Sequence, residues 1–406
     1  MRFFEKAVKI VASIMLAFFM LYQAAVFWTK AFHGFAWDYS INWTAAMALR
    51  EGLSLYDRVA LQQIAISHIG NNAHALFNGR FTSFIGLPTT AISHLPFAFL
   101  PYETSVLCYR SLALCAMLLA VFLTGLTLQS EQRWRAWLAG ILCLLLWNAF
   151  SFSLHLGQVD AWVILSLAIA VFSVSRARWK LAGVAIAVAV LLKISPIWLL
   201  FFCLLKRQWS VVFVASICLA MGLLLSCLPQ HGADIWQFLT VVLPSLGDSP
   251  LHVQNQSLGA FLARLATPDT QLLSFTAGIG IWKIVGTGIT AILLLVLYRS
   301  TRSTALQAEE LAAVILLALL AGPLTWDHYL SWAVIPVMLL AARLSPERIL
   351  LLFLLLVPLV FPVPYLKADI IASNAWWRVL TGVQISAVLL VAVWAINCCG
   401  TRSRQA

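Results

Sequence analysis

The sequence predicts an all-α protein that crosses a membrane many times, and three observations support this. Of 406 residues, 62% are hydrophobic and only 10% are charged, whereas a soluble globular protein carries about 25% charged residues. Apolar runs close to the length of a spanning helix, about 20 residues, recur along the chain. The net charge of +11 gathers in short loops, as expected of the cytoplasmic loops of membrane proteins. The charge therefore needs no nucleic-acid partner.

The apolar runs predict about ten full crossings. The first, from Ile10 to Trp28, follows a basic N-terminus and predicts a retained signal anchor with its N-terminus in the cytoplasm. Further crossings are expected at roughly 104–127, 136–154, 160–175, 210–228, 274–298, 309–322, 329–344, 347–362 and 378–397. An even number of crossings places both termini in the cytoplasm. We expect a single membrane domain over residues 1–406, with amphipathic helices on its outer face.

Two apolar segments do not fit as simple crossings. The segment Leu87 to Pro101 is short and contains three prolines, which interrupt helical hydrogen bonding. The segment Leu181 to Leu205 is interrupted by Lys193-Ile194-Ser195-Pro196 and has basic residues on both sides. We predict that it forms a re-entrant hairpin with both ends in the cytoplasm. Its bend would be buried in protein or would face a wet cavity.

Asp38 is the first candidate for chemistry, because it directly follows the first predicted span. A carboxylate at such a place is partly desolvated, which can keep it basic enough to take a proton from a hydroxyl. The alternative, which spacing alone favours, is that Asp38 caps the following helix. The sequence contains no Asp-x-Asp motif and no His/Cys set with metal-ligand spacing. We expect no metal and no cofactor.

Short motifs follow one another from residue 36 to residue 330. They are Asp38-Tyr39 with Gly52-x-x-Leu55-Tyr56, the aromatic and proline-rich stretch Phe81 to Pro101, Gly157-Gln158-Val159-Asp160, Gly183 to Pro196, Asn255-Gln256-Ser257-Leu258 with Arg264, and Pro323-x-x-Trp326-Asp327-His328. Together they resemble glycosyltransferase family 87, whose members have the GT-C fold and use polyprenyl-phosphate sugars. This chain departs from the family pattern at Thr325, where Ser is usual, and at Tyr329, where a second His is usual. Residues 331–406 would add further C-terminal transmembrane helices.

The resemblance implies an enzyme that transfers one sugar on the periplasmic face of a bacterial inner membrane. Asp38 would deprotonate an acceptor hydroxyl, which then attacks the anomeric carbon while polyprenyl phosphate leaves, with inversion. The sugar would be mannose or arabinofuranose. The acceptor would be a glycan, a glycolipid or a protein.

A departing phosphate gathers negative charge and needs cationic or hydrogen-bonding groups beside it. The candidates to bind the phosphate or the sugar are His328, Arg264, Lys193, Asn255, Gln256, Gln158, His155, Arg80, Tyr56, Trp326 and Asp327, with Lys367 as a further outer cation. Some have structural alternatives. Lys193 could instead neutralise Asp160. Ser257, which follows Asn255 and Gln256 in their motif, could simply cap a helix.

Two other functions stay open. A flippase or transporter for lipid-linked sugars would place broken helices in two related halves, and the sequence shows one such break, at Lys193 to Pro196. An oligosaccharide polymerase or ligase would need longer outer loops to hold a polymer.

Overall fold

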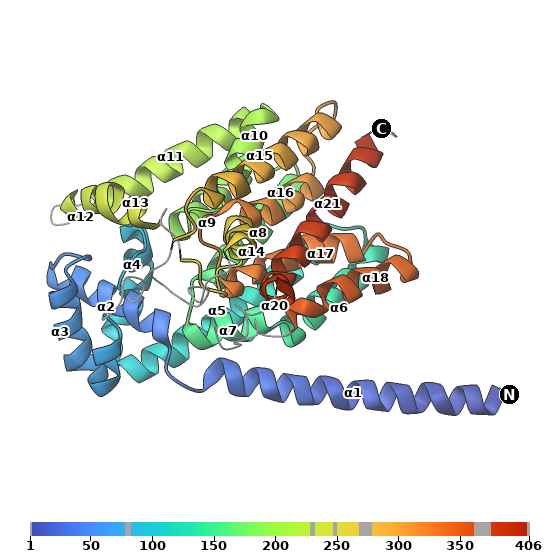
Figure 1. Ribbon diagram of the computed structural model, residues 1–406, viewed down its shortest axis with the longest axis horizontal. Helices are drawn as coiled ribbons and strands as arrows, with labels where there is room; N and C mark the ends of the chain where they lie inside the picture. Colours follow the sequence, from blue (N-terminus) through green and yellow to red (C-terminus); the bar gives the residue numbers. More distant parts are fainter. Residues whose placement is uncertain are drawn as a thin grey trace.

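The computed structural model describes residues 2–77, 83–227, 232–246, 250–267, 278–360 and 375–403. Within these ranges every extended regular element is a helix, and the only β-structure is two isolated bridges. Helices α2 (Trp37–Glu51), α3 (Arg58–Ile69) and α4 (Pro88–His94) gather at one end of the molecule. Both chain ends lie toward the opposite side (Figure 1).

The other helices lie beside this group, most of them in one bundle, and the two short helices within residues 232–246 lie at the same end as α2–α4 (Figure 1). The other helices are α1 (Arg2–Phe32), α5 (Tyr102–Leu126), α6 (Ser130–Leu146), α7 (Asn148–Leu156), α8 (Asp160–Ser175), α9 (Trp179–Leu192), α10 (Ile197–Leu205), α11 (Trp209–Leu225), α12 (Gly232–Gln237), α13 (Leu243–Leu246), α14 (Leu258–Ala266), α15 (Trp282–Thr301), α16 (Ala308–Ala321), α17 (Val334–Ala341), α18 (Pro346–Leu356), α20 (Ala375–Leu380) and α21 (Val383–Ser403). Short 3₁₀ turns are η1 (Gly70–Ala75), η2 (Leu95–Phe99), η5 (Asp327–Ala333) and η6 (Val357–Leu359), and Phe238–Val242 is a π-helical turn. Helix α16 is buried on all sides from Glu310 to Ala321, as expected of a helix that is apolar all round.

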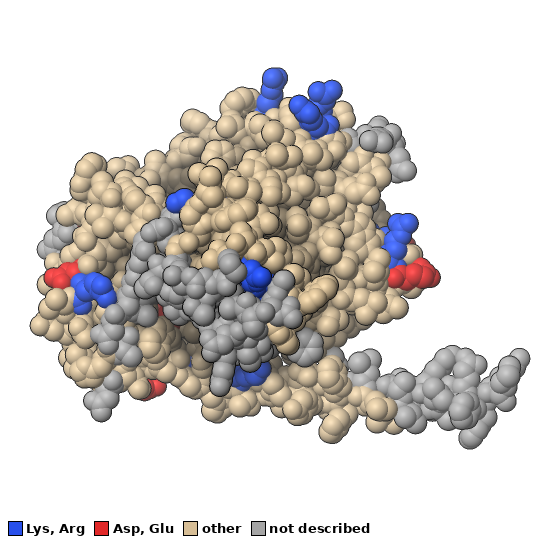
Figure 2. All heavy atoms as spheres, in the orientation of Figure 1, with Lys and Arg blue, Asp and Glu red and all other residues tan. Residues whose placement is uncertain are grey.

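Several helices have the length and apolar character of membrane spans. In the described part of the chain, α5, α15 and α21 qualify singly, and α6 with α7, bent by 59°, supplies up to a fourth. Helices α8, α9 and α11 are apolar but shorter than a span needs. The expectation of about ten full crossings is therefore not confirmed. Figure 2 shows few charged side chains, separated by broad uncharged surface, as a membrane protein requires.

Helices α9 and α10 form a hairpin whose tip is the segment 193–196. A Cβ placed on Gly183, near the start of α9, would lie 2.7 Å from the carbonyl oxygen of Val211, near the start of α11. One placed on Gly222 would lie 2.5 Å from Leu191, near the end of α9. Helices α9 and α11 are thus parallel, so α10 must carry the chain back. This reversal agrees with the predicted hairpin.

The turns that carry basic residues lie together. Arg176 Nη2 donates to the carbonyl oxygen of Leu126 at 3.2 Å, which joins the end of α8 to the end of α5. Lys206 Nζ donates to the carbonyl oxygen of Thr301 at 2.6 Å, which joins the end of α10 to the end of α15. Arg343, after α17, pairs with a glutamate in the first turn of α16. These helix ends therefore share one side of the bundle.

Candidate active site

A cavity of about 690 Å³ opens at the helix ends opposite the basic turns. It lies among the start of α2, the junction of α7 and α8, the tip of the α9–α10 hairpin and the segment leading into η5. Its polar lining includes Asp38, Gln158, Lys193, Gln254, Trp326, Asp327 and His328, and its apolar lining includes Leu87, Leu192, Ile194, Ile197, Trp198 and Phe238. Polar groups converge at one part of an otherwise apolar cavity, which is the usual form of a small-molecule site.

Asp38 lies in the first turn of α2 and does not cap it. The N-cap residue is Ala36, and no side-chain cap bond forms there. Asp38 Oδ2 instead accepts a hydrogen bond of 2.5 Å from Gln158 Nε2. The approach of the two segments depends on Gly157, whose φ is +68° and whose added Cβ would lie 2.4 Å from Tyr39 Cβ. Only glycine adopts this conformation readily and leaves this space.

The surroundings of Asp38 favour a proton acceptor. Burial raises the pKa of its carboxyl to about 6, and the hydrogen bond from Gln158 and the positive charge of Lys193 partly oppose this rise. The group is then mostly ionised at neutral pH, yet it is more basic than an ordinary aspartate. That combination suits a general base acting near pH 7.

Lys193 is held at the hairpin tip by a buried ion pair. Its Nζ lies 2.8 Å from Oδ1 of Asp160, a residue whose side chain is 0% exposed. The same oxygen accepts a bond of 2.8 Å from Trp332 Nε1. The ammonium also lies 3.3 Å from the ring centroid of Tyr329, within the range of a cation–π contact. The structural pairing considered for Lys193 is therefore present, and the lysine still lines the cavity.

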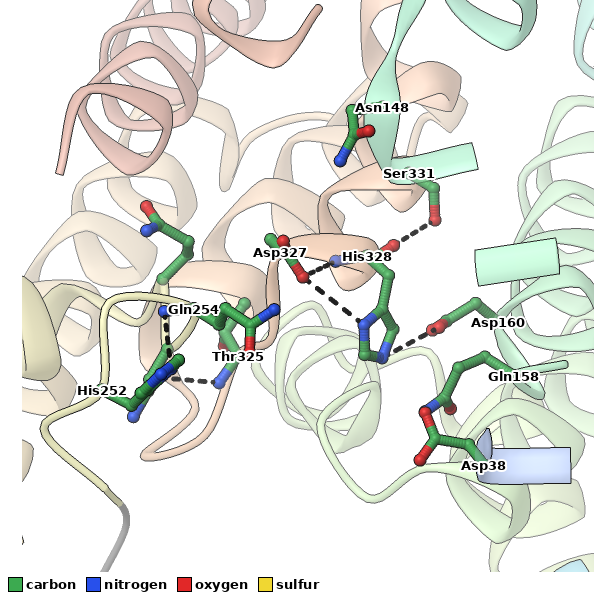
Figure 3. A network of polar contacts seen from close by, with 12 residues as sticks. Asp38, Asn148, Gln158, Asp160, His252, Gln254, Thr325, Asp327, His328 and Ser331 are labelled. Carbon is green, nitrogen blue, oxygen red and sulfur yellow. Dashed lines mark hydrogen bonds and ion pairs between the residues drawn. The ribbon is translucent and has the colours of Figure 1, made fainter. Parts of the chain in front are cut away.

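His328 lies between two carboxylates (Figure 3). Its Nε2 is 3.6 Å from Asp160 Oδ2, and its Nδ1 is 3.6 Å from Asp327 Oδ1. Both separations exceed a hydrogen bond. Among the described residues, neither ring nitrogen has a hydrogen-bond partner, although the side chain is only 4% exposed. Leaving such groups unpaired costs about 1–3 kcal/mol each, so a hydrogen-bonding ligand in the cavity would recover part of this cost.

Asn255 and Gln256 lie behind the cavity wall rather than in its lining. Asn255 Nδ2 donates to the carbonyl oxygen of Pro323 at 3.1 Å, and its Oδ1 accepts from the backbone N–H of Thr325 at 3.1 Å. The N–H of Gln256 donates to the carbonyl oxygen of Thr325 at 2.6 Å. Next to them, the carbonyl oxygen of Gln254 accepts from the N–H of Asp327 at 3.1 Å. Two motifs that are distant in sequence therefore form one unit, which we call the 254–257/323–327 cradle.

Arg264 supports this cradle from behind and is also absent from the cavity lining. Its side chain is 0% exposed and donates to the carbonyl oxygens of Asn255 at 2.7 Å and His252 at 3.1 Å. Its Nε donates to Thr381 Oγ1 at 3.0 Å. Ser257 caps α14, accepting from the N–H of Ala260 at 3.1 Å. The structure therefore does not bring Arg264 to the cavity as the sequence analysis expected of a donor-binding residue.

The remaining sequence candidates lie around the cavity or outside the described residues. His155 Nδ1 donates to the carbonyl oxygens of Lys30 and His33 at 3.0 and 2.9 Å, which ties α7 to the end of α1. Tyr56 Oη donates to the carbonyl oxygen of Gly86 at 2.7 Å, so it supports a lining residue. Arg80 and Lys367 fall outside the described residues.

Sequence analysis missed Gln254, which lines the cavity immediately before the Asn255 motif. Its position next to a motif was the only available signal. Over the residues that the structure describes, no group of three or more His, Cys, Asp or Glu side chains is arranged to hold a metal ion. The arrangement instead combines a carboxylate of raised pKa with a lysine and an unpaired imidazole beside an apolar wall.

Comparison with known proteins adds independent information. The family model of glycosyltransferase family 87 matches residues 84–323, more than half of the chain, and Asp38 precedes this match. A polyprenol-phosphate-mannose-dependent alpha-(1-2)-phosphatidylinositol mannoside mannosyltransferase of Mycolicibacterium smegmatis is 26% identical over 282 residues, 64% of this chain and 62% of the relative. Its counterpart of the same description from Mycobacterium tuberculosis is 26% identical over 322 residues, 73% of this chain and 72% of the relative.

A third relative is the corresponding phosphatidylinositol pentamannoside mannosyltransferase of Mycolicibacterium smegmatis. It is 29% identical over 188 residues, 45% of this chain and 42% of the relative. The chain thus spans less than two thirds of both M. smegmatis relatives, 62% and 42% of their lengths. No solved structure matches the chain.

Proposed function

The chain belongs to glycosyltransferase family 87, and on that premise we propose that it is a membrane glycosyltransferase that moves one sugar from polyprenyl phosphate to an acceptor hydroxyl. The observation that carries the proposal is the cavity. Asp38, a carboxylate of raised pKa, shares it with Lys193 and His328 and with an apolar wall. Base, phosphate-binding groups and a surface for an isoprenoid chain are the parts that such a transfer requires.

Asp38 acts as the general base. Its carboxylate removes the proton of the acceptor hydroxyl, and the oxygen attacks the anomeric carbon of the donor. The bond between that carbon and the phosphate oxygen breaks, and polyprenyl phosphate leaves with the electron pair. The displacement occurs in one step, so the anomeric configuration inverts. Gln158 fixes the carboxylate through its bond of 2.5 Å.

Lys193 and His328 receive the phosphate as it departs. The ammonium of Lys193 supplies a positive charge, and a neutral imidazole supplies one N–H donor. Neither ring nitrogen of His328 has a hydrogen-bond partner within the described residues, and the nitrogen that carries the proton gains one when a phosphate oxygen enters the cavity. Tyr329, which stands at the second His of the family motif, contributes its ring face to hold Lys193.

The apolar part of the cavity accommodates the first isoprene units. Leu192, Ile194 and Ile197 of the hairpin segment line it, and Thr287 of α15 also belongs to the cavity wall. Isoprenoid carbon gains free energy on leaving water, about 25 cal/mol for each Å² of apolar surface buried. The tail therefore anchors the donor while its phosphate meets the polar groups.

In the orientation that we propose for a bacterial inner membrane, the site faces the periplasm and both termini lie in the cytoplasm. Helix α8 runs from Asp160 in the site to the basic turn after Ser175, and α9 returns from Trp179 to Lys193. At 1.5 Å per residue, α8 separates the two ends by roughly 24 Å. The basic turns would then face the cytoplasm, in agreement with the positive-inside rule.

Mannose is the sugar that the relatives favour, because their names describe polyprenol-phosphate-mannose-dependent enzymes. Arabinofuranose is the competing sugar. The same names favour a glycolipid acceptor over a glycan or a protein, since they specify phosphatidylinositol mannosides.

Transfer by purified protein in detergent tests the proposal. Synthetic polyprenyl-phosphate mannose, polyprenyl-phosphate arabinofuranose and a nucleotide sugar are supplied in parallel with a mannosylated phosphatidylinositol acceptor. We expect transfer from a polyprenyl-phosphate sugar only, with loss of turnover in Asp38→Asn. Efficient transfer from the nucleotide sugar alone would contradict the proposal, as would an undiminished Asp38→Asn enzyme. A flippase would retain lipid translocation in that variant.

A further inference from the structure

Arg110 is a buried charge within α5, one of the candidate membrane spans. Its residue is only 3% exposed. It lies within the predicted crossing 104–127. A charged side chain at such a position is costly and is generally tied to a specific role.

The guanidinium of Arg110 binds four backbone carbonyl oxygens. Nε donates to Leu154 at 3.0 Å, and Nη1 donates to Phe32 at 3.1 Å. Nη2 donates to Gly34 at 3.2 Å and also to His155. The four acceptors belong to two separate segments, the end of α1 with its following linker and the last turn of α7.

Each segment leads directly to one partner of the Asp38–Gln158 bond. The linker after Phe32 enters α2 at Trp37, immediately before Asp38. The last turn of α7 ends at Gly157, immediately before Gln158. We infer that Arg110 is a positioning residue that sets the distance between the base Asp38 and Gln158 by holding both segments on α5. Its neighbour Tyr109 supports this role, since its Oη donates to the carbonyl oxygen of Gln158 at 3.2 Å.

The chemistry of the contact requires arginine. The guanidinium presents five N–H donors in a rigid plane, whereas an ammonium presents three from a single point. The acceptors on α1 and α7 are last-turn carbonyls, which carry the negative end of the helix dipole. That of Leu154 also accepts from the N–H of Gly157 at 3.1 Å. A lysine at position 110 would keep the charge but could not reach both segments at once.

This inference rests on the proposed function and concerns only how the general base Asp38 is positioned. Arg110 bonds directly to the segments that lead to Asp38 and Gln158, whereas Lys193 and His328 lie on the α9–α10 hairpin and η5 and contact this region through Asp160. A change at Arg110 should therefore disturb the base more than it disturbs donor binding. Misplacing a reacting group by about 1 Å can lower a rate by about 100-fold. Loss of Arg110 should therefore lower kcat much more than it changes the KM of the donor.

The test is Arg110→Lys in the full-length enzyme, assayed with polyprenyl-phosphate mannose. We expect kcat to fall at least about tenfold while the donor KM stays within about twofold of wild type. Arg133→Lys is the matched control, because Arg133 also donates to a backbone carbonyl, that of Leu128 at 3.1 Å, but lies at the far end of the bundle. It should behave as wild type.

A double variant separates positioning from general structural damage. If both residues act on the same carboxylate, Arg110→Lys should cause much less additional loss in a Gln158→Ala background than in wild type. If Arg110→Lys fails to fold, Gly34→Ala is assayed instead and judged by the same criteria. The φ of Gly34 is +83°, and an added Cβ would lie 2.9 Å from His155, so the substitution should disturb the same linker.

Three results would overturn the inference but leave the proposed function in place. Arg110→Lys could turn over normally, or it could raise the donor KM without changing kcat. In the double variant, the fold-losses of Arg110→Lys and Gln158→Ala could simply multiply. A wild-type enzyme that transfers no sugar would overturn the proposed function, and the inference with it.

Discussion

Lys193 Nζ lies 2.8 Å from Asp160 Oδ1, which joins the tip of the α9–α10 hairpin to the first residue of α8. The pair explains how a lysine is retained in an apolar segment, because Asp160 compensates its charge and Tyr329 covers its other side. It also leaves the ammonium at the cavity wall, where an anionic ligand can share it.

Asp38→Asn should lower kcat by about 100- to 10,000-fold, because the amide cannot accept the proton of the acceptor hydroxyl. Donor affinity should change little, since the phosphate-binding groups are untouched. Turnover and donor binding are measured on the same preparation. Asp57→Asn is the control: Asp57 caps α3, and asparagine caps equally well. Equal losses in both variants would point to general damage.

The pH dependence should follow the ionisation of Asp38. Because its pKa is raised to about 6, the base is protonated below that pH and the rate falls there. The rate should rise through pH 6 and level off above about pH 7. Gln158→Ala removes a bond that lowers this pKa, so the acid limb should move to higher pH. If the wild-type rate falls only near pH 4, the assignment of Asp38 as the base would be contradicted.

Lys193→Met should destabilise the protein by about 3–5 kcal/mol, because Asp160 is left as an uncompensated buried charge. Adding Asp160→Asn should recover much of this stability, since asparagine can still accept from Trp332. Donor binding should remain weak in both variants. Thermal unfolding in detergent and donor titration measure the two effects. A double variant no more stable than the single one would show that the ion pair is unimportant.

Asn255→Asp tests the 254–257/323–327 cradle. The substitution replaces the Nδ2 donor by an oxygen facing the carbonyl oxygens of Pro250 and Pro323, which should cost about 1–3 kcal/mol. We expect a lower unfolding temperature together with a raised donor KM, because the cradle carries His328 into the cavity. Asn72→Asp, at an exposed position, is the matched control. An unchanged donor KM in Asn255→Asp would separate the cradle from the site.

Chelation by EDTA should leave the activity within about twofold of its original value. In the proposed mechanism, Lys193 and His328 supply the charge and hydrogen bonding that a departing phosphate needs. Activity is measured before and after dialysis against EDTA. A large loss that Mg²⁺ or Mn²⁺ restores would show that these residues do not suffice.

The hairpin shows how far a sequence argument reaches. A lysine and a proline inside an apolar run predict both a break and a buried partner, because an uncompensated charge there is too costly. The structure contains the break and pairs Lys193 with Asp160. The number of full crossings was less predictable. The predicted span 136–154, for example, is broken between α6 and α7 at Trp147, where no proline or charge marks the bend.

The motif residues divide in a way that sequence could not show. Asn255, Gln256 and Arg264 were expected to bind the donor, and their side chains instead hold backbone of the cradle and the Thr381 turn. A sequence motif indicates that its residues lie in the same region of the fold. It does not indicate whether a given side chain lines the cavity or packs behind the cavity wall. The role of Arg110 could not be predicted for a related reason. Its partners are backbone carbonyls, which every residue has, so no sequence pattern marks them.

By itself, the amino-acid sequence determined the membrane class, the likeness to a transferase family and the residue types available for chemistry, because apolar content and local motifs are properties of the chain. Only the tertiary structure decided which of these residues meet. Asp38 and Gln158 are 120 positions apart, and their contact depends on how α5 and α7 pack. Side-chain direction and packing arise from the whole fold, and no local pattern encodes them.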